Sequence, residues 1–184
     1  MSLSSEILTG VPSKIVKAAK RVKLVLLDVD GVLTDGKVYY GNSGEELKAF
    51  DIKDGLGIKL LNSSNIMVGI ITGRTSKLVL RRAKELNMAP IIQGSEDKFE
   101  DIKKICLKYS LKLNQICFVG DDFPDLRAIH HVGLGICVAD ACLATRRIAQ
   151  WCTKSSGGNG AVREVAELLL AAQDRYQNTL EKYR

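Results

Sequence analysis

The chain has 184 residues, of which 46% are hydrophobic and 26% charged, and its formal net charge is +6 at pH 7. This length and composition are typical of one globular domain, residues 1–184, that can bury a hydrophobic core. No apolar run is long enough to span a membrane, and Met1–Gly10 lacks the pattern of a signal peptide. We therefore expect a cytoplasmic protein without a membrane partner.

The five cysteines form no Cys-x-x-Cys pair, and the adjacent His130 and His131 do not add a zinc-site spacing. We expect reduced thiols rather than a disulfide framework. Positive charges are spread over several segments, and only 5% of the residues are aromatic. Nucleic-acid binders usually combine a basic stripe with stacking aromatic side chains, so no nucleic-acid partner is expected. The basic surface could attract a small anion or could simply be solvated.

The expected elements start with a helix over Ser13–Arg21 and a short, apolar, β-branched strand over Val22–Leu27. A β-hairpin over Lys37–Phe50 follows, with glycine and asparagine in its turn, and then a helix over Asp54–Asn62. Strands and helices alternate from there to the end. The further strands are expected at Ile66–Ile71, Ile91–Ile92, Ile116–Val119 and Gly133–Val138, and the further helices at Ser76–Leu86, Lys98–Tyr109, Leu126–His131, Ala141–Ala149 and Ala161–Leu180.

This alternation predicts an α/β fold, a Rossmann-like doubly wound parallel sheet with helices on both faces. The hairpin would form a small flap beside the sheet. The hairpin and one helix fill the interval between the first two expected strands of the sheet, so we expect no cap domain.

Acidic and hydroxyl side chains follow three of the expected strands. Asp28 and Asp30 follow the first, Thr72 the second, and Asp121 a later one, while Lys98 begins a helix near the same edge. Ligands bind at the carboxyl ends of the strands in an open α/β sheet, so we expect these side chains to share a site.

This combination of groups suits phosphoryl transfer. Carboxylate oxygens bind Mg²⁺, which often shares its coordination with a phosphate, and a carboxylate can also attack phosphorus. A hydroxyl and an ammonium can stabilise the charge on phosphoryl oxygens. Each group alone has a plainer interpretation, as a turn, a helix cap or a solvated side chain. The glycine-rich loops of ATP-binding and dinucleotide-binding proteins are absent from the sequence.

Four ordered segments resemble the motifs of the haloacid dehalogenase superfamily: Asp28-x-Asp30-Gly31-x-x-Thr34, Thr72-Gly73-Arg74, Lys98 and Gly120-Asp121-Asp122-x-x-Asp125. A closer likeness covers nearly all of Val22–Gln173, where the chain resembles the capless 3-deoxy-D-manno-octulosonate 8-phosphate (Kdo-8-phosphate) phosphatases. The segments that carry this closer likeness are Asp28–Gly36, Tyr39, Gly41-Asn42, Gly44–Phe50, Asp54-Gly55, Ile70–Arg74, Gln93-Gly94 and Gly160–Val165.

The resemblance implies an Mg²⁺-dependent phosphoric monoester hydrolase that releases Kdo from its 8-phosphate for lipopolysaccharide precursor synthesis. Asp28 would be the nucleophile that forms an aspartyl-phosphate, and Asp30 would act as general acid and then general base. Thr72 and Lys98 would hold the phosphoryl group. The implied Mg²⁺ ligands are the Asp28 carboxylate, the Asp30 backbone carbonyl and Asp121, with Asp122 in support.

The resemblance also implies a set of substrate contacts. The planar fork of Arg74 suits the carboxylate of a sugar acid. Lys59 and Asp51 stand where the family leads us to expect Arg and Asn, and Cys142 stands where we expect the histidine of a His-Pro pair. The implied contacts are Asp30, Asp51, Ile52, Lys53, Asp54, Gly55, Lys59, Gly73, Arg74, Arg82 and Lys98.

An uncapped site cannot exclude water alone. The resemblance implies a homotetramer in which the hairpins pack together and the Gly157–Arg163 segment reaches a neighbour's site, although this segment could instead be a flexible linker before a helix.

Two other functions remain open. One is a phosphatase for a nine-carbon sugar-acid phosphate such as KDN-9-phosphate or N-acylneuraminate-9-phosphate, and the other is a catalytically silent tetrameric assembly module. A silent module would not need the complete set of acids, hydroxyl and ammonium.

Overall fold

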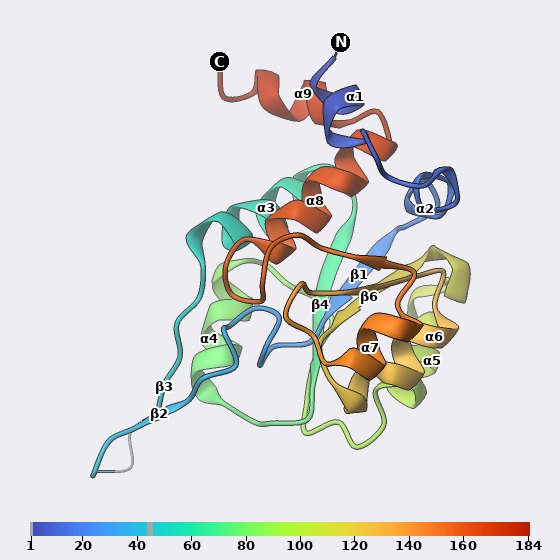
Figure 1. Ribbon diagram of the computed structural model, residues 1–184. Helices are drawn as coiled ribbons and strands as arrows, with labels where there is room; N and C mark the ends of the chain where they lie inside the picture. The colour runs from blue at the N-terminus through green and yellow to red at the C-terminus, as the bar shows by residue number, and fades with distance from the viewer. Residues whose placement is uncertain (1, 44–45) are drawn as a thin grey trace.

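The structure, a computed structural model, describes residues 2–43 and 46–184 (Figure 1). Within these residues, a six-stranded sheet has the order β5-β4-β1-β6-β7-β8, and each of its pairings is parallel. The strands are β1 (Leu24–Leu27), β4 (Met67–Thr72), β5 (Ile91–Gln93), β6 (Ile116–Gly120), β7 (Leu134–Cys137) and β8 (Trp151–Cys152). This is the strand order of the Rossmann fold, whose switch point lies between β1 and β6. The predicted α/β class is confirmed.

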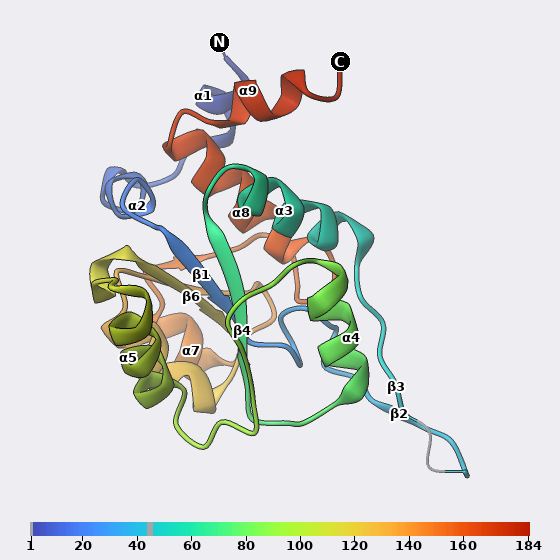
Figure 2. The same cartoon turned by 180° about the vertical axis from the view of Figure 1, so that it is seen from behind.

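Successive side chains of a strand point to opposite faces of the sheet. The strands are apolar on both faces, so helices cover both of them. Val25 and Leu27 of β1 face the core that α2, α3, α4 and α8 share, whereas Leu24 and Leu26 face α5 and α6. Figures 1 and 2 show these two helical layers from opposite sides. The helices are α1 (Leu3–Ile7), α2 (Ser13–Ala19), α3 (Ile52–Ser63), α4 (Lys77–Glu85), α5 (Lys98–Tyr109), α6 (Leu126–His131), α7 (Leu143–Ile148), α8 (Ala161–Ala172) and α9 (Tyr176–Glu181), with 3₁₀ turns at Leu113–Gln115 and Phe123–Asp125.

The C-terminal region differs from the expected single helix over Ala161–Leu180. The chain breaks after α8, where Asp174 has a φ of 57°, and α9 begins at Tyr176. The side chain of Gln173 donates to the carbonyls of Ala19 and Val22, at 3.0 and 2.9 Å, and thereby ties this break to the end of α2. A contact between residues so distant in sequence leaves no periodic signal. Strand β8 and helix α1 were likewise not predicted.

The predicted hairpin is present but its strands are short. β2 (Tyr39–Tyr40) and β3 (Glu46–Leu47) pair in antiparallel register, Tyr39 opposite Leu47. The expected turn includes Gly44, which lies outside the described residues. The hairpin projects away from the sheet (Figures 1 and 2) and leaves Tyr39, Tyr40 and Leu47 54%, 70% and 62% exposed.

Among residues 2–43 and 46–184, no helix is both long enough and apolar enough to cross a lipid bilayer. Between β1 and α3, the described part of the chain holds the hairpin and no cap domain, as the sequence predicted.

Candidate active site

The loop after β1 carries the first two candidate residues. The backbone N–H of Asp28 donates to the carbonyl of Val119 (3.0 Å), so Asp28 continues the pairing of β1 with β6, and its side chain is buried. Gly31 then turns the chain with a φ of +95°. A Cβ at Gly31 would lie 2.2 Å from Oδ2 of Asp121, so this glycine lets the two loops approach each other. The Thr34 hydroxyl accepts from the Gly31 and Gly36 amides and fixes the turn.

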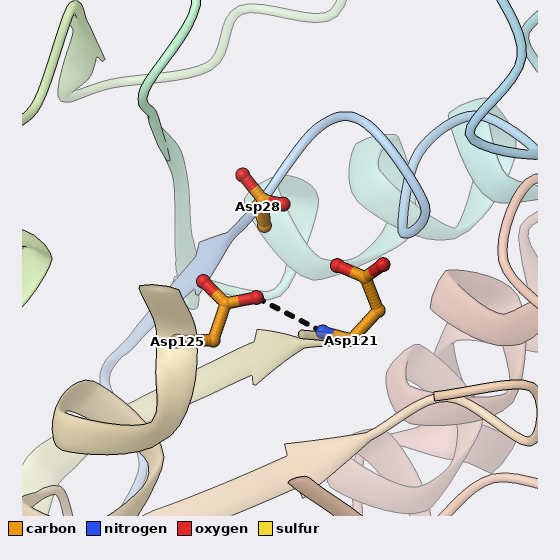
Figure 3. Close-up of side chains that lie close together, drawn as sticks. All are labelled: Asp28, Asp121 and Asp125. Carbon is orange, nitrogen blue, oxygen red and sulfur yellow. Dashed lines mark hydrogen bonds between the residues drawn. The ribbon is translucent and has the colours of Figure 1, made fainter. Parts of the chain in front are cut away.

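Three carboxylates meet at the carboxyl ends of β1 and β6 (Figure 3). Asp28, Asp121 and Asp125 each place one carboxylate oxygen so that these oxygens lie within 4.8 Å of one another. Asp125 comes from the 3₁₀ turn after β6, and its Oδ2 accepts from the backbone N–H of Asp121 (2.9 Å) and of Asp122 (3.4 Å). The switch point of the sheet therefore holds two of the acids that the sequence placed at strand ends, Asp28 and Asp121, together with Asp125.

Lys98 lies against this carboxylate cluster. It is the first residue of α5, and its Nζ is 2.7 Å from Oδ1 of Asp28 and 2.5 Å from Oδ1 of Asp125. Burial by itself would lower the pKa of Lys98, but the two carboxylates raise the pKa above its usual value. Lys98 therefore stays protonated. The side chain of Asp97 caps α5 by accepting from the amides of the next turn, which fixes where Lys98 begins the helix.

The cluster keeps an excess of negative charge. Burial, together with repulsion from Asp28 and Asp125, raises the pKa of Asp121 to about 8. Burial and Asp125 raise the pKa of Asp28 to about 6, against the lowering effect of Lys98. In addition, Oδ1 of Asp121 is buried without a hydrogen-bond partner among the described residues. Because both oxygens of Asp125 already accept N–H groups, Asp28 and Asp121 are the carboxylates best placed to bind a cation.

Oxygen ligands and unbalanced negative charge are what a hard divalent cation such as Mg²⁺ requires. The residues present thus fit the magnesium ion that the sequence predicted. Asp122 does not join the cluster: its side chain is exposed and accepts from the Phe123 amide (2.8 Å), so it caps the 3₁₀ turn. Asp125 occupies the supporting position that was expected for Asp122, because its side chain points inward from the same turn.

Asp30 lies at the edge of the cluster, under the hairpin. Its Oδ1 forms an ion pair with Nζ of Lys48, whose side chain is fully buried, and its Oδ2 is 3.6 Å from Nε of Arg74. Arg74 in turn donates to the hydroxyl of Tyr40 (3.0 Å). The structure therefore joins the predicted Asp30 and Arg74 through the flap. Lys48 was not predicted, and its sole signal was the family likeness of Gly44–Phe50.

Thr72 ends β4, next to β1 in the sheet, and is 3% exposed. Its hydroxyl accepts from the Arg74 amide (3.4 Å), and its carbonyl accepts from the Ser95 amide. Gly73, which lies between Thr72 and Arg74 in the sequence, is exposed. The hydroxyl thus lies at the same edge of the sheet as the carboxylates, as the sequence predicted.

The side chains at the start of α3 that were predicted to contact the substrate bind mainly backbone amides of this chain. Asp51 is the N-cap of α3 and accepts from the amides of Lys53 (2.6 Å) and Asp54 (3.0 Å). Asp54 is buried and accepts from the amides of Gly160 (3.3 Å) and Arg163 (2.7 Å), so it joins α3 to α8. Burial raises the pKa of Asp54 to about 6.

The other predicted contacts near α3 differ in exposure. Ile52 is 82% exposed, and Lys53 and Lys59 are also exposed. Gly55 is buried against α4: a Cβ there would come within 2.4 Å of Nη2 of Arg82. Their role as substrate contacts stays a prediction.

The Gly157–Arg163 segment packs on its own chain. The Gly158 amide donates to the carbonyl of Val32 (2.9 Å), and a Cβ at Gly157 would lie 1.7 Å from the Gly31 carbonyl oxygen. Within this chain the segment is therefore bound to the loop after β1, and its reach into a neighbour's site stays a prediction.

Comparison with known proteins agrees with this geometry. The model of the haloacid dehalogenase-like hydrolases matches residues 87–165. The 3-deoxy-D-manno-octulosonate 8-phosphate phosphatases KdsC of Yersinia pestis and Escherichia coli K12 are 41% and 42% identical, over 91% and 90% of this chain and 89% and 88% of their own.

Solved structures are similar over most of their length. The Moraxella catarrhalis 3-deoxy-D-manno-octulosonate 8-phosphate phosphatase, in complex with magnesium ion, phosphate ion and KDO, has a TM-score of 0.92 and 44% identity, covering 94% of this chain and 99% of that one. The cobalt-bound enzyme of Haemophilus influenzae has a TM-score of 0.83 and 34% identity, covering 86% and 93%. The chain therefore belongs to the 3-deoxy-D-manno-octulosonate 8-phosphate phosphatase family of the haloacid dehalogenase-like hydrolases.

Proposed function

We propose that this chain is an Mg²⁺-dependent phosphatase that hydrolyses Kdo-8-phosphate to Kdo and phosphate, supplying a lipopolysaccharide precursor. The observation that carries the proposal is the cluster of buried Asp28 and Lys98 with the partly buried Asp121, and Asp30 lies two residues beyond the nucleophile. Relatives with 41–42% identity carry the same activity in their names.

In the proposed reaction, an oxygen of the Asp28 carboxylate attacks phosphorus and the bond between phosphorus and the sugar oxygen breaks. Asp30 donates its proton to the leaving sugar oxygen, and an aspartyl-phosphate remains on Asp28. The ionised Asp30 then takes a proton from water, whose oxygen attacks phosphorus and restores the Asp28 carboxylate. Lys98 and Thr72 hold the phosphoryl oxygens by donating hydrogen bonds.

The carboxylates of Asp28 and Asp121 and the backbone carbonyl of Asp30 would hold Mg²⁺. When bound, this ion would neutralise charge on the phosphoryl group and on the carboxylates. Asp125 orients Lys98 and the Asp121 amide, so its part is to position the groups that meet the substrate.

We assign the sugar-acid carboxylate to Arg74, because its guanidinium already faces a carboxylate, that of Asp30. Arg82, Lys53 and Lys59 supply further positive charge around α3 and α4. We further propose a cytoplasmic homotetramer, which the exposed apolar residues of the hairpin support.

The decisive experiment compares wild type, Asp28→Asn and Asp35→Asn on Kdo-8-phosphate with Mg²⁺. Asp28→Asn should lose roughly 10³-fold or more of kcat, because an amide oxygen is a poor nucleophile. Asp35 lies in the same loop but is exposed and pairs with Lys37, so Asp35→Asn should stay near wild type. EDTA should abolish turnover.

Full activity of Asp28→Asn would disprove the mechanism. A parallel measurement of kcat/KM on KDN-9-phosphate decides the substrate, since specificity is that ratio. A higher value for the nine-carbon substrate would show that the sugar acid is assigned wrongly. Turnover of neither substrate, nor of other sugar phosphates, would favour the silent assembly module.

A further inference from the structure

A basic groove lies at the edge of the sheet opposite the carboxylate cluster, at the amino ends of β1, β4 and β6. Its volume is about 770 Å³. It is formed by the connections from α2 to β1, α3 to β4, α5 to β6 and α8 to α9. In Figure 1 these connections surround the end of β1 that joins α2, far from the hairpin. The cations of this basic groove are Lys20, Arg21, Lys23, Lys112 and Arg175.

These five cations have no acidic counterpart. None of the described residues that line the groove is Asp or Glu. Nor does any of the five form an ion pair with an acidic side chain that the structure describes. The whole chain carries a net charge of +6, so much of its positive excess gathers in this one cavity. The cations come from three distant parts of the sequence. For this reason the positive charge appeared spread along the chain when the sequence was considered alone.

Most of this charge is not used to hold the fold together. Gln173 already binds the carbonyls of Ala19 and Val22, and Arg175 donates to the carbonyl of Ser64. By contrast, Lys20, Arg21, Lys23 and Lys112 are exposed and line the groove. Like charges around one cavity repel one another, and a bound anion would remove that repulsion.

The uncharged residues that line the groove indicate which kind of anion it could bind. Met67 and Leu111, which are partly exposed, add an apolar surface, and Asn114 and Gln115 add polar groups that can bind a sugar or base. A cavity of this volume lies within the range that small-molecule sites occupy. No aromatic side chain is among the described lining residues, so the stacking that single-stranded nucleic acids need is missing.

We propose that the basic groove binds a soluble organic di- or triphosphate, at a site separate from the phosphatase centre. Its phosphates would contact the lysine and arginine side chains, and its organic part would lie on the apolar surface. The proposal needs no metal, because the groove itself supplies the opposite charge. It is also independent of the substrate assigned to the active site.

The test is calorimetric titration with ATP and with inorganic tripolyphosphate, in EDTA. Without Mg²⁺ the carboxylate cluster repels anions, so binding there is suppressed. The triple variant Arg21→Gln, Lys23→Gln and Lys112→Gln should weaken ATP binding by roughly tenfold or more, since it removes three charge-assisted contacts. The matched control, Lys14→Gln, Lys17→Gln and Lys84→Gln, loses the same charge from exposed residues outside the groove and should change binding less than about twofold. Melting curves of both variants establish that they fold.

We expect one ATP per chain, tighter binding of ATP than of tripolyphosphate, and unchanged binding to Asp28→Asn. Equal weakening in the two triple variants would overturn the proposal, because it would mean nonspecific attraction. So would loss of binding in Asp28→Asn, or no binding of ATP at millimolar concentration. Tighter binding of a short single-stranded oligonucleotide than of ATP would also overturn it, in favour of a nucleic-acid surface.

Discussion

At the scale of single residues, the site combines three carboxylates that repel one another with one ammonium group that attracts them. Lys98 offsets part of the repulsion among Asp28, Asp121 and Asp125 by lying within 2.7 Å of Asp28 and 2.5 Å of Asp125. Asp121 receives no such contact, and its Oδ1 has no hydrogen-bond partner among the described residues. The unpaired Asp121 carboxylate therefore lowers the stability of the metal-free protein, and substitution of Asp121 should change how stability depends on Mg²⁺.

The pKa of Asp121, raised by burial and by its neighbours to about 8, gives a pH prediction. A carboxyl whose pKa is higher in the folded than in the unfolded chain binds more protons when folded, so stability falls as pH rises from about 4 to about 8. In EDTA at about pH 8, Asp121→Asn should melt above wild type, by roughly 2–8 °C after allowance for partial exposure. The difference should shrink at about pH 5, where the carboxyl is neutral in the folded protein.

Thermal melts with and without Mg²⁺ check this prediction, and Asp122→Asn is the control because its side chain is exposed. Added Mg²⁺ should raise the melting temperature of wild type and of Asp122→Asn, but hardly that of Asp121→Asn. A wild-type melting temperature in EDTA that rises from about pH 5 to about pH 8 relative to Asp121→Asn would contradict the assignment.

Lys48 is the residue through which the flap contacts the proposed acid and base. Lys48→Met would remove the ion pair between the buried Lys48 side chain and Asp30 and leave the Asp30 carboxylate less well positioned. We expect kcat on Kdo-8-phosphate to fall roughly 10–100-fold with a smaller change in KM, since a misplacement of about 1 Å can cost this much. Lys48→Arg should restore part of the rate.

Steady-state kinetics of Lys48→Met and of Lys37→Met provide the comparison. Lys37 begins the same flap but is 68% exposed and pairs with Asp35, so its loss should leave kcat near wild type. Equal losses in both variants would mean that the flap acts through its overall charge rather than through the contact of Lys48 with Asp30.

At the scale of elements, the loop after β1 is held by a second loop, before α8. The Gly158 amide binds the Val32 carbonyl, and Gly157 lies against Gly31 with no room for a Cβ. Asp54 of α3 binds the first amides of α8 from the side, as a cap supplied by another helix. The position of Asp28 and Asp30 thus depends on a segment that follows them by more than half the chain.

Gly157→Ala tests this support. The added Cβ would lie 1.7 Å from the Gly31 carbonyl oxygen, so the two loops must separate. We expect a loss of about 1–3 kcal/mol in the free energy of unfolding and a lower kcat. Chemical denaturation and kinetics measure both quantities. Ser156→Ala, in the same loop, is the control, and an unchanged kcat in Gly157→Ala would show that the loop after β1 holds its geometry alone.

At the scale of the whole molecule, the two ends of the sheet have opposite charge. The carboxyl ends of β1 and β6 carry the carboxylate cluster, and the amino ends of β1, β4 and β6 border the basic groove. The hairpin projects from the first of these ends (Figure 2). Its side chains Tyr39, Tyr40 and Leu47 are exposed to solvent. Exposed apolar groups gathered on one projecting element are typical of an interaction surface.

The proposed tetramer predicts that charge on the hairpin separates the subunits. Tyr39→Lys combined with Leu47→Lys should give a smaller assembly in light scattering, because each substitution places an ammonium at the proposed apolar interface. Leu107→Lys on α5 is the matched control, since Leu107 is 82% exposed and far from the hairpin in sequence. A wild-type protein that is monomeric at micromolar concentration would contradict the tetramer.

The sequence by itself determined the fold class and the meeting of Asp28, Thr72, Lys98 and Asp121 at one edge. Apolar runs reveal where buried strands end, and parallel strands bring their carboxyl ends together. Only the tertiary structure decided the ion pair of Asp30 with Lys48, the cap that Asp54 provides for α8, and the inward turn of Asp125. The basic groove was decided in the same way. Each depends on the direction of a side chain and on contacts between distant segments, and local periodicity encodes neither of these.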